Sequence, residues 1–354
     1  MKKDISRREA LHWIAITVAA SLSACRRIGQ ITKDKNQLSS TQTATHSSVS
    51  TSTSQPEIEQ EMNTKGNLNI PKVFMIKSIS ADGLMRIYEA LDKNISGNVA
   101  IKISSGEPGG HYFLSPDLIL PLVGTVNGTI VECNTAYGGK RAETTSHRHV
   151  MEDHGFTTIA PTDIMDADGT ISIPISGGTH LVEDIVGSHF SNYDFVINLA
   201  HFKGHAMGGF GGVIKNMSIG IASQQGKCLI HTAGASSTSI WGEDQDDFLE
   251  SMAEAAKGVA DYMKGNILHI DVMNNLSVDC DCDSSPAAPT MQDIGILASL
   301  DPVAVDQACV DLVYAAPDGK DLIERIESRN AIHTLEHGEA IGLGSRKYEL
   351  IDID

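Results

Sequence analysis

The sequence predicts an α/β fold, a mainly parallel sheet with helices on both faces, built either as one body or as two lobes with a cleft. Short apolar and β-branched runs alternate with longer segments whose apolar residues recur at helical spacing. Helical segments between such strands are typical of the crossovers that connect parallel strands. Residues 1–66 do not follow this pattern, so we expect residues 67–354 to form the folded domain.

The first half of this domain contains strand-like runs separated by predicted helices, and two residues mark where such helices begin or end. Pro116 lies near the start of one apolar segment and suits a first helical turn. Gly155 follows another segment and is typical of a helix end. In order, the predicted elements are a strand over Val73–Ile79, a helix over Ala81–Asn94, a strand over Asn98–Ser105, a helix over Pro116–Gly124, a strand over Thr129–Asn134, a helix over Ala142–His154, and strands over Thr157–Pro161 and Tyr193–Ala200.

The second half contains the longest predicted helix, Asp244–Met263, which acidic residues open and Lys264-Gly265 ends. Ile267–Met273 and Ile294–Ser299 read as buried strands. A last helix covers Asp301–Tyr314, with Asp301 as its N-cap and Pro302 in its first turn. In sheets of this kind, ligands bind beyond the carboxyl ends of the strands, so the loops that follow strands are the places to look for a site.

The N-terminal segment predicts export and lipid anchoring. Lys2, Lys3, Arg7 and Arg8 precede an apolar run too short for a permanent membrane helix. The run ends in Leu22-Ser23-Ala24-Cys25, which resembles a bacterial lipobox, so we expect residues 1–24 to be removed and Cys25 to be acylated. Residues 6–11 also resemble a twin-arginine signal, which leaves twin-arginine and general export both open. The alternative is a short amphipathic helix with a chance cysteine.

Residues 25–66 predict a disordered, lipid-anchored linker. From Ser39 to Ser54, 12 of 16 residues are Ser or Thr, so this stretch has too little apolar surface to offset the entropy of ordering it. We therefore expect a flexible tether between a bacterial cell-envelope membrane and the domain, which would face the periplasm or the cell surface.

The charge of the chain excludes one class of partner. The net charge is -18, and removal of residues 1–24, with four basic and two acidic residues, brings it near -20. Nucleic-acid binding needs a basic footprint, so no nucleic-acid partner is expected. Electrostatic adhesion to anionic lipid is disfavoured for the same reason, which leaves the acyl chain on Cys25 as the link to the membrane.

One loop after a strongly apolar strand concentrates polar chemistry. Residues 198–216 hold two histidines, two lysines and several glycines, which let backbone amides approach a ligand closely. The Gly-Lys-Ser/Thr ending of a phosphate loop is absent, but an anion cradle with Lys203 or Lys215 as counter-charge remains open. We expect Lys203 and Lys215 to be catalytic or anion-binding, and His201, Gly211, Gly212 and Asn216 to bind a cofactor. The alternative is a tight crossing loop with solvated lysines.

A second feature predicts metal ligation. In Asp279-Cys280-Asp281-Cys282-Asp283, side chains two residues apart can point the same way in an extended segment. Thiolates favour zinc, copper(I) or iron–sulfur ligation, and two of them need further ligands. His205 and His231 are the candidates, which gives the metal set His205, His231, Cys280, Asp281, Cys282 and Asp283. The two cysteines are at an awkward spacing for a disulfide; the alternative is an acidic turn with two free thiols. Cys133 and Cys309 read as buried core residues.

These motifs together resemble the domain-of-unknown-function family 362. The resemblance covers nearly all of residues 72–345 in order. It is carried by residues 99–110, 137–141, 149–156, 201–205, 209–216, 226–227, 280–283 and 293–309. Members are often described as iron–sulfur centre proteins, and many carry an inserted ferredoxin-like segment. This chain has no cysteine between His231 and Cys280, so the resemblance does not imply a pair of ferredoxin clusters here.

A shorter resemblance points to the same kind of fold. His205 with Gly209-Phe210-Gly211-Gly212 and Lys215 is similar to a segment of nickel-dependent lactate racemases, which implies an α/β fold with a cleft that holds His and Lys.

The motifs and resemblances together leave three function classes open. The first is a metal-dependent enzyme or redox protein, with a metal ion or iron–sulfur cluster, acting on an anionic small molecule. The second is a non-catalytic metal- or ligand-binding lipoprotein, and the third is an interaction scaffold.

Overall fold

The computed structural model describes residues 70–242 and 244–354, which belong to one compact unit. The predicted signal segment, Cys25 and the Ser/Thr-rich linker lie outside the described residues. Among the helices of the described part, none combines the length and the apolar character that a membrane span requires.

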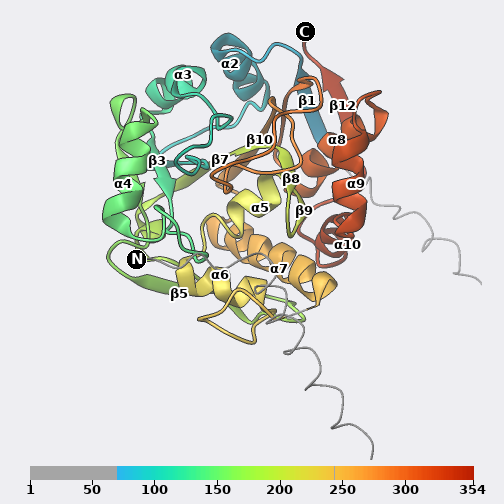
Figure 1. Cartoon of the computed structure of the whole chain (residues 1–354). Helices are drawn as coiled ribbons and strands as arrows, with labels where there is room; N and C mark the ends of the chain where they lie inside the picture. The colour runs from blue at the N-terminus through green and yellow to red at the C-terminus, as the bar shows by residue number, and fades with distance from the viewer. Residues whose placement is uncertain (1–69, 243) are drawn as a thin grey trace, which may run out of the picture. The chain divides into compact units, whose positions relative to one another are not determined.

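The core of the domain is an eight-stranded sheet in the order β12-β1-β11-β10-β7-β2-β3-β4, which confirms the predicted α/β class (Figure 1). Strands β10, β7, β2, β3 and β4 pair in parallel, whereas β11 pairs antiparallel with both β10 and β1. The strands are β1 Lys72–Ile76, β2 Val99–Lys102, β3 Thr129–Glu132, β4 Thr162–Ile164, β7 Phe195–His201, β10 Ile267–Met273, β11 Gly295–Ser299 and β12 Glu349–Asp352.

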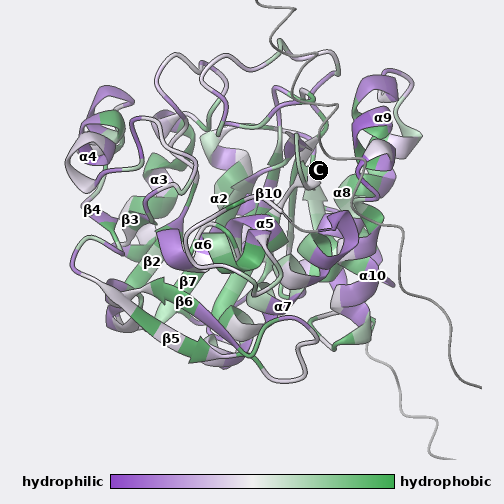
Figure 2. Ribbon diagram, turned by 60° about the horizontal axis from the view of Figure 1, so that its bottom comes forward, coloured by the Kyte–Doolittle hydropathy of each residue, from purple (hydrophilic) through white to green (hydrophobic). Residues whose placement is uncertain are grey.

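Helices cover both faces of this sheet. On one face, residues of α2 (Ala81–Ala90), α3 (Pro116–Val126) and α4 (Thr144–Asp153) join a core with Ile197 and Ile270. On the other face, Val196 belongs to a larger core with residues of α5 Val213–Met217, α6 Gln224–His231, α7 Gln245–Met263, α8 Pro302–Ala315, α9 Lys320–Ser328 and α10 Ile332–Ala340. Because successive residues of a strand face opposite sides, β7 contributes to both cores, and every one of its residues is buried. The central strands of the sheet are mainly green, that is hydrophobic, in Figure 2.

Two short hairpins lie outside the main sheet: β5 Thr170–Pro174 with β6 Glu183–Gly187, and β8 Lys203–His205 with β9 Gly209–Gly211. The predicted strand over Thr157–Pro161 is wrong. The chain turns at Gly155 with φ +86°, Phe156–Thr158 forms a 3₁₀ turn that buries Phe156, and β4 begins only after Pro161. The predicted N-cap at Asp301 is confirmed, since its side chain accepts from the Ala304 amide.

Candidate functional site

The site lies where β7 leaves the sheet and meets the loop between β10 and β11. After His201, the chain folds into the β8–β9 hairpin, in which Lys203 is paired with Gly211 and His205 with Gly209. Gly204 must lack a side chain, because a Cβ there would lie 2.5 Å from the Val278 carbonyl oxygen. Its amide donates to Ser277 O at 2.8 Å. The hairpin and the cysteine-bearing loop are therefore in direct backbone contact.

Asp281 fixes the orientation of that loop. Its carboxylate accepts from Lys203 Nζ at 2.9 Å and from His201 Nδ1 at 2.9 Å, and all three side chains are buried. His201 Nε2 in turn donates to Asn274 O at 2.7 Å. Three residues predicted as catalytic, cofactor-binding and metal-ligating thus form an internal ion-pair cluster (the Asp281 cluster), which occupies both ring nitrogens of His201.

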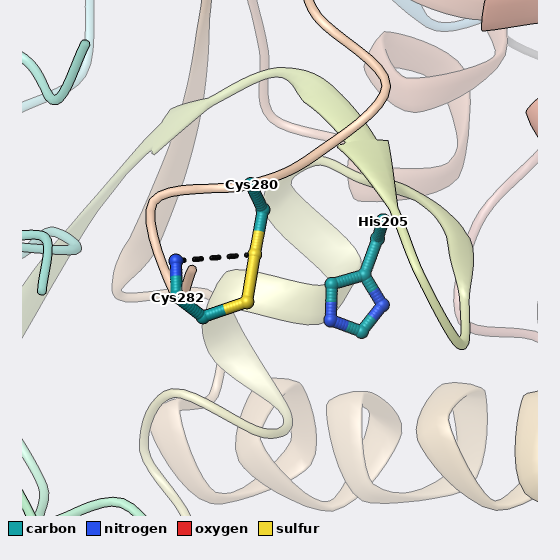
Figure 3. Close-up of side chains that lie close together, drawn as sticks. All are labelled: His205, Cys280 and Cys282. Carbon is teal, nitrogen blue, oxygen red and sulfur yellow. Dashed lines mark hydrogen bonds between the residues drawn. A yellow bond between two sulfur atoms is a disulfide. The ribbon is translucent and has the colours of Figure 1, made fainter. Parts of the chain in front are cut away.

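The two sulfurs on either side of Asp281 are joined to each other. Cys280 and Cys282 form a disulfide, and the Cys282 amide donates to Cys280 Sγ at 3.2 Å (Figure 3). The expectation that this spacing disfavours a bridge was wrong, because the tight turn, closed by Asp283 N donating to Cys280 O at 3.0 Å, brings the two Cα atoms to 5.3 Å. In this oxidised form, neither sulfur is a thiolate.

His205 faces the disulfide. Its nearest ring nitrogen and the two sulfurs all lie within 4.8 Å of one another, a grouping that could hold a metal ion once the disulfide is reduced. Figure 3 shows the Nε2 edge of the ring turned toward the sulfurs, while Nδ1 accepts from the Gly208 amide at 2.8 Å. Because a backbone amide can only donate, the proton of the neutral ring is on Nε2. Burial lowers the pKa of His205 well below its usual value, so the ring is neutral at neutral pH.

His231 carries its ring proton on the other nitrogen, Nδ1. Its Nδ1 donates to Lys227 O at 2.7 Å, which leaves the lone pair on Nε2. Burial lowers its pKa to about 4, and the ring stacks on Phe248 at 4.9 Å. His231 lines the same pocket as His205 but lies outside the group of three close ligand atoms. The same holds for Asp283, whose Oδ1 accepts from Ser285 N at 2.8 Å.

The disulfide and both histidines line a cavity of about 640 Å³. Met207, Ile219, Ile240 and the exposed Trp241 supply apolar surface. Charged residues on the wall include Glu107, Lys140, Lys215 and Lys227. The volume is in the range of small-molecule sites, and a mainly apolar lining with a few polar groups is typical of such sites.

Lys215 lies at the centre of the polar wall. It lines this main cavity and two smaller ones beside it, and burial lowers its pKa to about 8. No described residue accepts a hydrogen bond from its ammonium group. Its position depends on Asp306, which accepts from the amides of Val213 at 2.8 Å and Ile214 at 3.0 Å and so holds the start of α5.

The predicted cofactor-binding residues of the glycine-rich segment have structural contacts. A Cβ on Gly212 would lie 2.2 Å from Asp306 Oδ1, and one on Gly211 would lie 3.1 Å from Lys215 Cδ. Asn216 donates to Lys102 O at 3.0 Å and accepts from Lys102 Nζ at 3.0 Å. All three line a small cavity of about 50 Å³ together with His201 and Asp281.

Sequence reasoning did not select Lys102, Lys227 or Arg141 as site residues. Arg141 bridges Glu107 at 2.8 Å and Glu132 at 3.1 Å, and it lines one of the two smaller cavities. Lys102 is a lysine at the end of a fully buried strand, which is itself an unusual position and was a usable signal. Lys227 lies in the short helix α6 and is only 5% exposed.

The fold and the site define an α/β protein with a cysteine–histidine pocket at the carboxyl ends of parallel strands. The family model "Domain of unknown function (DUF362)" matches residues 99–311, and the chain belongs to this family. No curated protein matches the chain. Among solved structures, the lactate racemase apoprotein from Thermoanaerobacterium thermosaccharolyticum is similar at 15% identity with a TM-score of 0.42. The match covers 68% of this chain and 56% of the racemase chain, a likeness too low to carry a functional argument.

Proposed function

We propose that this domain is a thiol redox protein that acts on an anionic small molecule by reversible opening of the Cys280–Cys282 disulfide. The observation that carries this proposal is the disulfide on the wall of a 640 Å³ cavity, next to His205. Opening the S–S bond takes up two electrons and two protons, and a thiol or dithiol donor that is itself oxidised to a disulfide supplies both.

The two pocket histidines suit complementary parts in this exchange. His205 presents an N–H toward the sulfurs, and a hydrogen bond to a leaving thiolate stabilises it. His231 presents a lone pair and can accept the proton of an incoming thiol. Lys215 supplies positive charge for the anionic part of the substrate. In this scheme the Asp281 cluster positions the sulfurs and does not itself react.

A redox titration tests the proposal. The protein is equilibrated in a series of buffers that differ in the ratio of reduced to oxidised dithiothreitol. The free thiols are then trapped with a maleimide, and the modified residues are identified by mass spectrometry. We expect a reversible two-electron transition confined to Cys280 and Cys282. Cys309→Ser is the matched control, because Cys309 is buried and lies away from the pocket. A disulfide that cannot be reduced without denaturant, or bridge formation that fails on reoxidation, would contradict the proposal.

Metal binding is the second candidate function, favoured by the close grouping of His205, Cys280 and Cys282. The reduced cysteines would hold the ion with His205, whose proton would have to move from Nε2 to Nδ1, so that Nδ1 could no longer accept from the Gly208 amide. Such an ion would supply Lewis-acid chemistry in the pocket. Common iron–sulfur clusters use four thiolates, and the described residues bring only two to this cavity, so a single ion fits better than a cluster.

The metal candidate is tested on reduced protein purified without a metal-affinity tag. Zinc and nickel are added, and bound metal is measured by elemental analysis after gel filtration. Near-stoichiometric metal in the wild type, lost when Cys280 and Cys282 are both changed to Ser, supports a metal site. Turnover would then separate a metal-dependent enzyme from a non-catalytic binding lipoprotein, since a carrier binds its ligand reversibly without chemistry.

We also propose that the mature protein is held at the bacterial envelope membrane by acylation of Cys25. The lipobox-like residues before Cys25 and the Ser/Thr-rich segment after it support this proposal. Metabolic labelling with a palmitate analogue should mark the wild type, whereas Cys25→Ser should remain unlabelled and unprocessed. Labelling that persists in Cys25→Ser would overturn the anchor.

A further inference from the structure

Three lysines meet at one small cavity next to the disulfide. Lys102, Lys215 and Lys227 line a space of about 80 Å³ that also borders Cys282. Lys102 is 2% exposed and Lys227 is 5% exposed, so their ammonium groups have little contact with bulk water. Burial is the largest cause and lowers the pKa of both Lys102 and Lys215. The nearby charges of Glu132 and Asp281 oppose it, whereas the charge of Lys227 lowers both pKa values further, as expected for like charges close together.

None of these three ammonium groups has an ion-pair partner among the described residues. Lys102 Nζ donates to the Ile103 carbonyl and to Asn216 Oδ1, and within residues 70–242 and 244–354 Lys227 Nζ donates only to the Ala222 carbonyl. Lys215 Nζ has no hydrogen-bond partner in that part of the chain. Leaving the buried charges of Lys102 and Lys227 unpaired is costly, and a chain with a net charge of -18 has many acids that could have paired them.

The carboxylates closest to the cavity are already engaged. Glu132 pairs with Arg141 at 3.1 Å and with His147 at 3.0 Å. Asp281 is held in its own cluster with His201 and Lys203. Asp184 is the remaining acid near Lys227, but burial raises its pKa to about 7, so it is only partly ionised at neutral pH. The cavity therefore carries a surplus of positive charge.

We propose that this cavity binds a tetrahedral oxyanion with two negative charges, a phosphoryl or sulfate group, held by Lys102, Lys215 and Lys227. Ammonium groups act as separate point charges that can approach a tetrahedral anion from several sides, whereas the flat fork of Arg141 is used by Glu107 and Glu132. Gly220 keeps the space open, since a Cβ there would lie 2.5 Å from Lys102 Nζ. Assigning this oxyanion to the substrate rests on the redox function proposed above; binding of the free oxyanion does not.

The test uses thermal unfolding and isothermal titration of the whole oxidised protein with phosphate, sulfate and acetate at constant ionic strength. We expect phosphate and sulfate to raise the Tm of the wild type by roughly 2–4 °C, and acetate to have no effect. Lys227→Met should have a higher Tm than the wild type without anion, because an unpaired buried charge is gone. The same variant should lose the response to phosphate.

The matched control is Lys320→Met. The Lys320 side chain is 81% exposed and does not line the cavity. It should keep both the basal Tm and the phosphate response of the wild type. No phosphate or sulfate response in the wild type would overturn the proposal, and so would an unchanged response in both Lys227→Met and Lys102→Met. A fall in the anion-free Tm of both variants would assign these lysines a structural role instead. The disulfide titration is run in phosphate-free buffer, so either proposal can fail without the other.

Discussion

Lys203 Nζ donates to Asp281 Oδ1 at 2.9 Å, so a lysine with no exposed side-chain surface holds the residue between the two bridged cysteines. The hydrogen bond joins residues 78 positions apart in the chain. It couples the β8–β9 hairpin to the loop that follows β10. The geometry of the disulfide therefore depends on a buried ion pair.

Breaking this pair should be strongly destabilising. Lys203→Met removes the cation and leaves Asp281 buried with His201 as its remaining partner, so we expect a loss of roughly 3–5 kcal/mol in the free energy of unfolding. Urea denaturation followed by circular dichroism measures it. The control is Lys257→Met, which breaks the more exposed Lys257–Asp261 pair and should cost less than about 1 kcal/mol. Equal losses in the two variants would contradict a central role for Lys203.

The buried acids Asp271 and Asp306 predict an unusual pH dependence. Burial raises the pKa of Asp306 to about 6, and burial together with the charge of Asp306 raises that of Asp271 further. The folded protein thus binds protons that the unfolded chain releases near pH 4, so this pair stabilises the fold in acid and loses that contribution as pH rises through its folded pKa values.

Asp271→Asn should remove most of the stability loss that accompanies a rise in pH. Between pH 5 and pH 8, we expect the free energy of unfolding of the wild type to fall more than that of the variant, by on the order of 1–3 kcal/mol. Urea titrations of both proteins at the two pH values check the difference, and contributions from other groups cancel between them. A parallel pH dependence would show that Asp271 is not protonated in the folded protein.

The described cysteines should fall into two classes of reactivity. Cys133, Cys228 and Cys309 are at most 6% exposed, and burial raises the pKa of each thiol. Native protein treated with iodoacetamide should therefore gain no label at these positions, and reduction should add label only at Cys280 and Cys282. Peptide mass spectrometry gives the sites, and denatured protein is the positive control. Label at Cys228 before reduction would show that the packing around α6 opens in solution.

Glu254 ties the β5–β6 hairpin to α7. Its buried carboxylate accepts from Thr179 N at 2.6 Å, Leu181 N at 2.8 Å and His337 Nε2 at 3.1 Å. Burial alone would raise its pKa, but these hydrogen bonds outweigh it and lower the pKa, so the stabilisation is present above about pH 4.5 and is lost as pH falls through the folded value.

Glu254→Gln should accordingly lose about 1–3 kcal/mol of stability at pH 7, and the gap to the wild type should narrow in acid. Denaturant titrations at pH 7 and pH 4 measure it. Glu336→Gln changes a half-exposed glutamate on the adjacent α10 and should be near neutral. A gap that widens in acid would mean that the carboxylate is not the stabilising form.

The long periodic segments were predictable, and the site geometry was only partly so. The helix over Asp244–Met263 agrees closely with α7, because its apolar periodicity is strong and Asp244 caps its start. The strand over Ile267–Met273 matches β10, because a short and mainly apolar run is typical of a buried strand. The hairpin strands β8 and β9 have three residues each and are rich in glycine, so no periodicity marks them. That Asp281 is enclosed by His201 and Lys203 depends on contacts across about eighty residues, which local pattern cannot reveal.

The reversed direction of β11 has a consequence for how the protein is made. Because β11 runs antiparallel to β10, the cysteine loop that connects them leaves and re-enters the sheet at the same end of these strands, without a crossover helix. The loop has only one fixed end until β11 has paired with β10 and β1. The two thiols should therefore stay mobile on the growing chain and reach His205 only after residue 299 has emerged and joined the sheet, which makes the pocket one of the last parts of the molecule to mature.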